Sequence, residues 1–313
     1  MKKIQKLLMV VFLALTTMGY SKSTQDVQVY TTLESGVTTK TIEKGFDANG
    51  LTMAGNNDMN KPFSTRFKTL HYKVYNLAMF SNTDLTFKIL KKYPSFGALT
   101  PLSMSIWQDK DGSMNASTLT INGMSRATGV PVNDPDLIAY AALIKDTLQK
   151  ALPKGHFKEL NHTVKFPTKS FAVNFTADVE LDDEATPADF IEDFEAEFEG
   201  ELEPLGFLLP NYTDVQEEIF DDNAYTGVYD FFHTYSICKF DVIYPVSKLH
   251  PEAGAWAPCS FYIYKKVGEE KMHMGFLGVD NWITTLDMSD EASIKPLREA
   301  EKMIVDIITE MTE

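Results

Sequence analysis

The hydrophobic and polar residues of the second half alternate first as strands and then as helices. Alternation with a period of two predicts strands, and Thr186 followed by Pro187 is typical of a helix start. The expected elements are a strand at 170–179, a helix from Thr186 to Gly206, a short strand at 207–209, a strand at 231–242, a short helix or turn at 245–251, a hairpin of strands at 259–266 and 271–279, and a final helix capped by 289–291.

The first half shows the same order of patterns. The expected elements are a strand at 26–33, a helix at 38–46, strands near Leu51 and at 70–80, a short helix at 85–90, strands at 102–109 and 113–121, and a helix that starts at Asp134 and ends before Pro153. Each half therefore reads β-α-β-β-β-β-α with hairpin-sized connections. We predict an α+β fold of two tandem two-layer domains, each an antiparallel sheet with helices on one face.

A repeat within the chain supports this duplication. Residues 97–107 match residues 254–264 position for position, and one extra loop residue then brings Met114 opposite Met272. Upstream, we align residues 75–80 with residues 235–240. We expect a first repeat domain at 24–152, a linker at 153–168, and a second repeat domain at 169–313, with the two repeats packed on each other.

The N-terminus has the pattern of a secretory signal peptide. Three lysines within the first six residues precede an apolar run from Leu7 to about Leu15, and small or polar residues follow. The run is too short to span a bilayer comfortably. We expect a signal peptide at 1–21 and a periplasmic or otherwise secreted protein, with no membrane insertion after the signal is removed.

The charge of the chain excludes one class of partner. The formal net charge is −15 at pH 7, and acidic residues are concentrated along 192–203, where apolar residues spaced four apart predict an amphipathic helix. An acidic surface repels phosphate backbones, so we expect no nucleic-acid partner. The chain also lacks a glycine-rich phosphate loop, and no cofactor is predicted.

The pattern around the second cysteine resembles a bacterial family known as domain of unknown function 302. A long strand ends near Cys238, a short helix follows, and Ala257-Pro258-Cys259 opens a strand that runs into a Gly-Glu hairpin. Residues 170–310 are similar to this family, and residues 26–152 resemble a diverged copy that lacks both cysteines. The resemblance implies a long helix on a curved antiparallel sheet, as in TATA-binding-protein or helix-grip folds. It implies no catalytic residues.

The two cysteines, Cys238 and Cys259, both lie in the second half, and their repeat counterparts are Ala78 and Leu102. A pair absent together from one copy is what a bonded or jointly liganding couple would show. Three interpretations stay open: a structural disulfide if the two strands are neighbours, inert core thiols because Cys259 shares a strand face with Phe261, and a functional thiol pair without the usual C-x-x-C spacing.

Met272, His273 and Met274 are candidate copper(I) ligands, because soft thioethers and imidazole suit that ion. On a strand, however, the two methionines share one face with Phe276 and His273 points to the other. This division favours a core role for the methionines. The histidines show no metal-ligand spacing on a helix, which argues against a zinc enzyme.

Aromatic residues are the remaining candidates for contacts. Trp107 stands opposite Tyr264 in the repeat, so both copies place an aromatic residue there. We expect Trp107, Tyr262 and Tyr264, with Trp256 and Trp282, to form a domain contact or an apolar ligand pocket.

Three classes of function remain. The first is a non-enzymatic exported module that binds a small ligand or a protein partner. The second is a thiol redox or sulfur-handling protein that uses Cys238 and Cys259, and the third is a copper-handling protein that uses the strand from Met272 to Met274. We favour the first class, since a sheet-and-helix domain without a recognisable catalytic constellation is more often a binding module.

Overall fold

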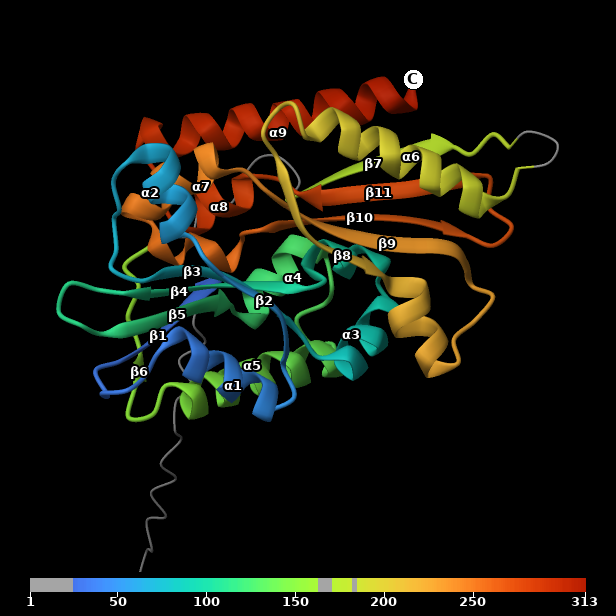
Figure 1. Cartoon of the computed structure of the whole chain (residues 1–313). Coiled ribbons are helices and arrows are strands. Elements are labelled where there is room, and N and C mark those ends of the chain that lie inside the picture. The colour runs from blue at the N-terminus through green and yellow to red at the C-terminus, as the bar shows by residue number, and fades with distance from the viewer. Residues whose placement is uncertain (1–24, 163–170, 182–184) are drawn as a thin grey trace, which may run out of the picture.

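Each half of the chain folds into an antiparallel sheet whose outer face is covered by helices (Figure 1). The computed structural model describes residues 25–162, 171–181 and 185–313. The expected signal peptide at 1–21 and part of the expected linker at 153–168 lie outside the described residues. The predicted α+β fold class is confirmed.

The elements of the first half follow the predicted order. They are β1 (Val27–Thr32), α1 (Thr39–Ala48), β2 (Thr52–Asp58), α2 (Asn60–Phe67), β3 (Tyr75–Ser81), α3 (Thr83–Leu90), the 3-10 turn η1 (Pro94–Leu99), β4 (Leu102–Gln108), β5 (Met114–Leu119), α4 (Ile121–Thr128), α5 (Pro135–Ala151) and β6 (His156–Phe157).

The second half repeats this order. Its elements are β7 (Ala172–Asp178), α6 (Pro187–Leu202), β8 (Leu208–Asp214), the turns η2 (Gln216–Phe220) and η3 (Asp221–Asn223), β9 (Tyr229–Cys238), α7 (Phe240–Leu249), the 3-10 turn η4 (Pro251–Ala255), β10 (Cys259–Lys266), β11 (Lys271–Leu277), α8 (Asp280–Thr285) and α9 (Glu291–Thr312).

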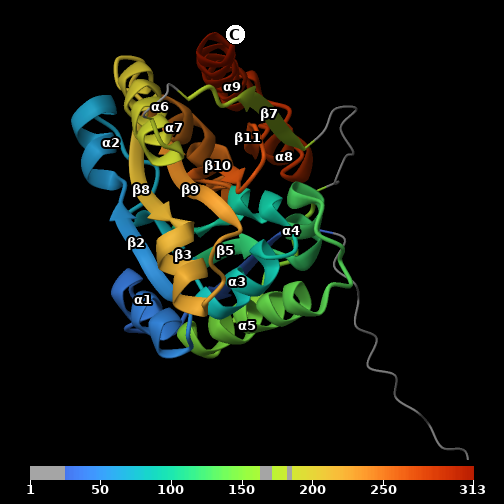
Figure 2. The ribbon, with the colours of Figure 1, turned by 90° about the vertical axis from the view of Figure 1, so that its right-hand side faces the viewer.

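The two sheets have the same strand order. The first runs β2-β3-β4-β5-β1-β6, and the second, read in the same sense, runs β8-β9-β10-β11-β7. The extra strand β6 comes from the expected linker and pairs with Tyr30 and Thr31 of β1. In two views at right angles, helices α6 and α9 lie on one side of the paired sheets and α1 and α5 on the other (Figures 1 and 2).

Capping side chains start the long helices where the sequence predicted. The Thr186 hydroxyl accepts a hydrogen bond from the Asp189 backbone N–H at the start of α6. Asp134 and Asp290 cap α5 and α9 in the same way. The apolar stripe of α6 then faces the sheet, where Phe198 stacks on Phe261 with ring centroids 4.9 Å apart.

The predicted strand at 231–242 is too long. Strand β9 ends at Cys238, and α7 begins at Phe240, not at residue 245. No capping side chain marks the start of α7, and Pro245 lies inside the helix. Its apolar residues Val242, Ile243 and Val246 are nevertheless spaced to bury one helical face.

The sheet register also corrects the repeat alignment around Cys238. Leu102 pairs with Phe80 in the first half, and its counterpart Cys259 pairs with Ile237 in the second. Phe80 therefore corresponds to Ile237. The counterpart of Cys238 is the next residue, Ser81, and not Ala78.

Reciprocal hydrogen bonds join the inner faces of the two halves. The Ser103 hydroxyl donates to the Pro258 carbonyl oxygen at 2.9 Å, and the Ser260 hydroxyl donates to the Pro101 carbonyl oxygen at 3.3 Å. In the repeat, Ser103 corresponds to Ser260 and Pro101 to Pro258. The two contacts are therefore the same contact made in both directions, as in a twofold-symmetric dimer.

Two repeat-related glycines show the same reciprocity. A Cβ atom built at Gly97 would lie 2.7 Å from the Cβ of Tyr262, and one built at Gly254 would lie 2.3 Å from the Cβ of Ser105. Ser105 and Tyr262 are repeat counterparts. Each half therefore places the backbone of its 3-10 turn directly on the central strand of the other half.

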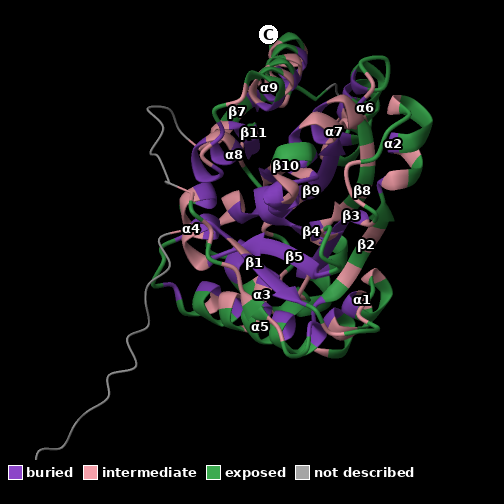
Figure 3. Ribbon diagram, turned by 90° about the vertical axis from the view of Figure 1, so that its left-hand side faces the viewer, coloured by how far each residue is buried: buried purple, intermediate pink, exposed green. Residues whose placement is uncertain are grey.

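The deepest part of the molecule lies between these layers. The central strands β1, β4, β5, β9 and β10 are mostly buried, while the outer surfaces of α1, α2 and α6 are exposed (Figure 3). Within the described part of the chain, every helix is too short or too polar to cross a membrane.

Candidate functional site

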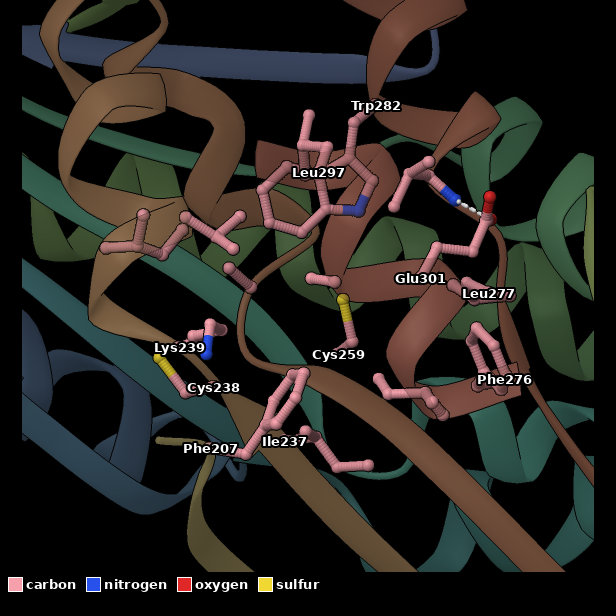
Figure 4. Close-up of a pocket in the computed structure, with 16 residues that line it drawn as sticks. Phe207, Ile237, Cys238, Lys239, Cys259, Phe276, Leu277, Trp282, Leu297 and Glu301 are labelled. Carbon is pink, nitrogen blue, oxygen red and sulfur yellow. Dashed lines mark hydrogen bonds between the residues drawn. The ribbon is translucent and has the colours of Figure 1, made fainter. Parts of the chain in front are cut away.

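An apolar cavity lies between the outer face of the second sheet and helices α7, α8 and α9 (Figure 4). Its volume is about 60 Å³, which suits a group of a few non-hydrogen atoms. The walls include Phe207, Ile243, Leu277, Leu297 and Ile304. Three residues that the sequence singled out also line it: Cys238, Cys259 and Trp282.

Trp282 brings a buried hydrogen-bond donor without a strong acceptor to this cavity. The residue is 2% exposed, and its indole nitrogen is turned toward Cys259 (Figure 4). Among the described residues the indole N–H has no oxygen or nitrogen acceptor, and the group it faces is the Cys259 sulfur, which is a weak acceptor. A buried donor that meets only a weak acceptor is poorly satisfied, so it marks a place where an oxygen acceptor would bind favourably.

Cys259 lies beside this indole as a neutral thiol. Burial raises the pKa of the Cys259 thiol to about 12, the nearby Cys238 adds to the rise, and the Trp282 indole N–H, which faces the sulfur, opposes it. The thiol contacts the carbonyl oxygen of Trp256 at 3.5 Å. Because the thiolate is the reactive form, this cysteine is a poor nucleophile near neutral pH.

Cys238 and Cys259 are both free thiols, so the disulfide among the predicted interpretations is not present in this structure. Cys259 pairs with Ile237, which places its side chain on the outer face of the sheet and that of Cys238 on the opposite face. Figure 4 shows the sulfur of Cys238 turned away from Cys259. Side chains that diverge in this way cannot be bridged without movement of the backbone. Burial also raises the pKa of the Cys238 thiol to about 12.

Smaller side chains in the second half leave room for the cavity. Cys259 stands where the first half has Leu102. When α5 and α9 are aligned on the aspartates that cap them, Ala300 stands where the first half has Ile144. Both first-half residues are fully buried, and their extra carbon atoms occupy the corresponding space.

Two charged residues line the edge of the cavity, and both are already engaged. The Glu301 carboxylate accepts a hydrogen bond from the Val279 backbone N–H at 2.8 Å and lies 3.5 Å from Arg298. The Lys239 ammonium donates to the Leu205 carbonyl oxygen and lies 4.8 Å from the ring centre of Phe207. The polar groups of the rim therefore hold the walls in place.

The candidate copper ligands divide between two faces, as the strand period requires. Met272 and Met274 are each 1% exposed and belong to the core on the outer face of the sheet. His273 points to the other face, where it stacks on Tyr264 and its Nε2 lies 3.1 Å from Glu269. Among the described residues, no group of three or more His, Cys, Asp or Glu side chains could hold a metal ion.

The other aromatic candidates lie apart from the cavity. Tyr262 faces the first half at Gly97 and donates to Asn174 at 2.9 Å. Trp107 donates its indole N–H to Asp109 at 2.9 Å. The indole N–H of Trp256 donates to the Thr285 hydroxyl at 3.1 Å.

One buried polar cluster was not found from the sequence. His233 on β9 lies 2.6 Å from Glu195 of α6 and 3.8 Å from Asp214 of β8. Burial, with the neighbouring Glu195 charge, raises the pKa of Tyr235 beside them. The available signal was the strand period, which places His233 and Tyr235 on the helix-covered face, but the position of the α6 acids over them appears only in three dimensions.

Comparison with known proteins places the family resemblance on the first half. Residues 27–154 match the family model described as "Domain of unknown function DUF302". The first half of this chain is similar to DUF302. The sequence pattern around Cys238 and Cys259 predicts the stronger resemblance in the second half, whereas the family model matches the first. A comparison with curated proteins found no significant match.

Among solved structures, the chain is similar to an uncharacterized conserved DUF302 protein from Bacillus stearothermophilus. The sequence identity is 13% and the TM-score is 0.37, with 46% of this chain and 100% of that chain covered.

Proposed function

We propose that this chain is an exported, non-enzymatic binding protein made of two copies of one domain. In this proposal the cavity beside Cys259 and Trp282 in the second copy binds a small apolar ligand that carries one hydrogen-bond acceptor. The buried indole N–H of Trp282, which faces only the weakly accepting Cys259 sulfur in an apolar cavity, carries the proposal. The signal-peptide pattern supports export, and the equal strand order of the two sheets supports the duplication.

The state of the thiols favours binding over redox chemistry. Both cysteines have a pKa of about 12 and are therefore protonated at neutral pH. A redox-active pair needs an accessible thiol of low pKa and a second sulfur within bonding reach. Cys238 and Cys259 provide neither, because burial raises both pKa values and the register separates their side chains.

The three tryptophans provide a direct test by NMR. We expect 2-butanone, a small ketone, to shift the indole N–H signal of Trp282 saturably. The indole signals of Trp107 and Trp256 serve as internal controls, since both N–H groups already have partners. An unmoved Trp282 signal, or equal movement of all three, would contradict the proposal.

Two alanine-to-isoleucine substitutions on α9 test the position of the ligand. Ala300→Ile introduces the residue that the first half carries at the matching position, and we expect it to fill the cavity and weaken 2-butanone binding at least about tenfold, because the ligand must then displace a packed side chain. Ala292→Ile adds the same volume at an exposed position of the same helix and should leave binding unchanged. Equal binding by both variants would place the ligand elsewhere.

A further inference from the structure

A groove lies between helix α6 and the outer face of strands β8 and β9, which run beside that helix in Figure 2. We call it the α6 groove. The helix contributes Glu192, Glu195 and Glu199 to its walls, and the strands contribute Asp214 and His233. Its volume of about 550 Å³ falls within the range of small-molecule sites. It shares no lining residue with the cavity at Trp282.

The strand register turns the polar side chains of the sheet into this groove. Asp214 of β8 pairs directly with His233 of β9, so the two side chains lie on the same face of the sheet. Glu195 of α6 lies 2.6 Å from the His233 ring, which identifies that face as the one covered by the helix. The charge of Asp214 therefore faces the helix across the groove.

Three carboxylates of α6 form a row along the other wall. Glu192 and Glu199 stand three residues before and four residues after Glu195, so all three lie on one side of the helix. The row is about 10 Å long at the rise of an α-helix. Burial, and after it the charges of Glu195 and Glu199 among others, raises the pKa of both Tyr212 and Tyr235 on the facing strands. The carboxylates therefore lie over tyrosine side chains.

Two acceptor atoms in the walls lack a donor. The His233 side chain is 9% exposed, and its Nδ1 donates to the Glu195 carboxylate, which leaves a lone pair on Nε2. No described residue donates to Nε2, and Asp214 lies 3.8 Å away, beyond hydrogen-bond distance. Gln216 donates its amide N–H to Asp221 at 2.6 Å, while its buried carbonyl oxygen accepts nothing from the described residues. Both atoms require a ligand with N–H or O–H groups.

The charge of the groove requires that ligand to be a cation. None of the described residues that line it is lysine or arginine. Asp230, also in the wall, is already paired with Lys265, but the carboxylates of α6 and Asp214 have no such partner in the walls. Among the described residues, no group of three or more His, Cys, Asp or Glu side chains could hold a metal ion. The negative charges are therefore spread out, which suits a ligand whose positive charges are also spread out.

We propose that the α6 groove binds a linear aliphatic polyamine. One terminal ammonium group donates to His233 Nε2 and to the Asp214 carboxylate, and the other ammonium groups lie along Glu195 and Glu199. The methylene groups between them pack on the Tyr212 ring, which is 46% exposed. The inference stands or falls independently of the function proposed for the cavity at Trp282.

Equilibrium dialysis of the full chain against radiolabelled spermidine tests this site. At about 0.15 M sodium chloride, where exposed charges are largely screened, we expect saturable binding of one spermidine per chain. n-Butylamine, with a single ammonium group, should displace the label only at concentrations at least about tenfold higher than unlabelled spermidine. The indole N–H signal of Trp282 should stay in place, which separates this site from the other cavity. Absence of saturable binding, or displacement by magnesium chloride as effective as by spermidine, would overturn the proposal.

Two substitutions on α6 form a matched pair. Glu199→Gln and Glu197→Gln each remove one exposed charge from the same helix, but only Glu199 lines the groove. We expect Glu199→Gln to weaken spermidine binding at least about threefold and Glu197→Gln to leave it nearly unchanged, because the second charge lies on the other side of the helix and is screened. Equal effects of the two substitutions would show general attraction to an acidic surface and would contradict the proposal.

Asp214→Asn tests the opposite wall. Asparagine keeps an oxygen for the Glu217 backbone N–H, from which Asp214 accepts a hydrogen bond at 2.9 Å, and removes the charge beside His233 Nε2. We expect spermidine binding to weaken at least about threefold. An unchanged affinity would place the ligand away from His233 and would overturn the proposed position of the terminal ammonium group.

Discussion

Gly254 is one of two residues whose missing side chain lets the halves touch. A Cβ atom there would lie 2.3 Å from the Ser105 Cβ and 2.8 Å from a Leu77 methyl group. Ser105 lies on a buried strand whose backbone cannot shift to make room for a new Cβ atom. We therefore expect Gly254→Ala to lower the free energy of unfolding by about 1–3 kcal/mol. Urea unfolding followed by circular dichroism measures this change.

Gly200 supplies the matched control for that substitution. It lies in helix α6, and a Cβ atom there would meet no atom within 4 Å. Gly200→Ala should therefore raise the free energy of unfolding by up to about 1 kcal/mol, because alanine is the better helix former. Equal effects of the two variants would mean that the halves separate or shift at little cost.

At the same scale, residue type alone identified part of the candidate site. Cys238, Cys259 and Trp282 were singled out from the sequence, and the structure places all three around one cavity. The cavity itself was not predictable, because it depends on the small volumes of Cys259 and Ala300, which are distant in the chain. The alignment of Cys238 with Ala78 failed for a related reason, since only the strand register shows that Ser81 is its counterpart.

Helix α9 depends on Asp290, which caps its first turn and lies 3.1 Å from His250. Burial alone would raise the pKa of Asp290, but hydrogen bonds from Ser293 and His250 outweigh it and lower the pKa below its ordinary value of 3.8. The charged carboxylate therefore stabilises the fold above that value. This contribution is lost as the pH falls through the lower pKa of the folded state.

Asp290→Asn isolates the charge, because asparagine keeps the capping oxygen. We expect the variant to be less stable than the parent by about 0.3–1 kcal/mol at pH 7. The difference should shrink as the pH falls below about 3.8. Urea unfolding of both proteins at a series of pH values measures it, and a difference that does not depend on pH would show that the charge contributes nothing.

A capping side chain located the three longest helices, but not every helix. The helices capped by Thr186, Asp134 and Asp290 begin where the sequence indicated, because the capping side chain is a local signal. Helices α2 and α8 have no side-chain cap, and neither was predicted; α4 was missed as well, although Thr120 caps it, because its first residue was assigned to the strand predicted at 113–121. Their apolar faces are satisfied by tertiary packing, which a short segment does not reveal.

At the scale of the whole molecule, the reciprocal contacts mean that each half carries both sides of the interface. The first half contains Gly97, which packs against Tyr262 of the other half, and Ser105, against which Gly254 of the other half packs. It likewise holds the Ser103 donor and the Pro101 acceptor of the paired hydrogen bonds. A second copy of the first half could therefore make the same contacts, with Gly97 against Ser105 in both directions.

We expect residues 25–162 alone to form a homodimer through this face, because the inner surface of the sheet would otherwise be exposed to water. Sedimentation equilibrium gives the mass of the fragment in solution. Gly97→Ala in the same fragment should shift the equilibrium toward monomer, because the new Cβ atom of each copy would clash with Ser105 of the other copy. A folded monomer at micromolar concentration would contradict this expectation. It would show that the fit between the halves depends on residues such as Tyr262 that only the second half carries.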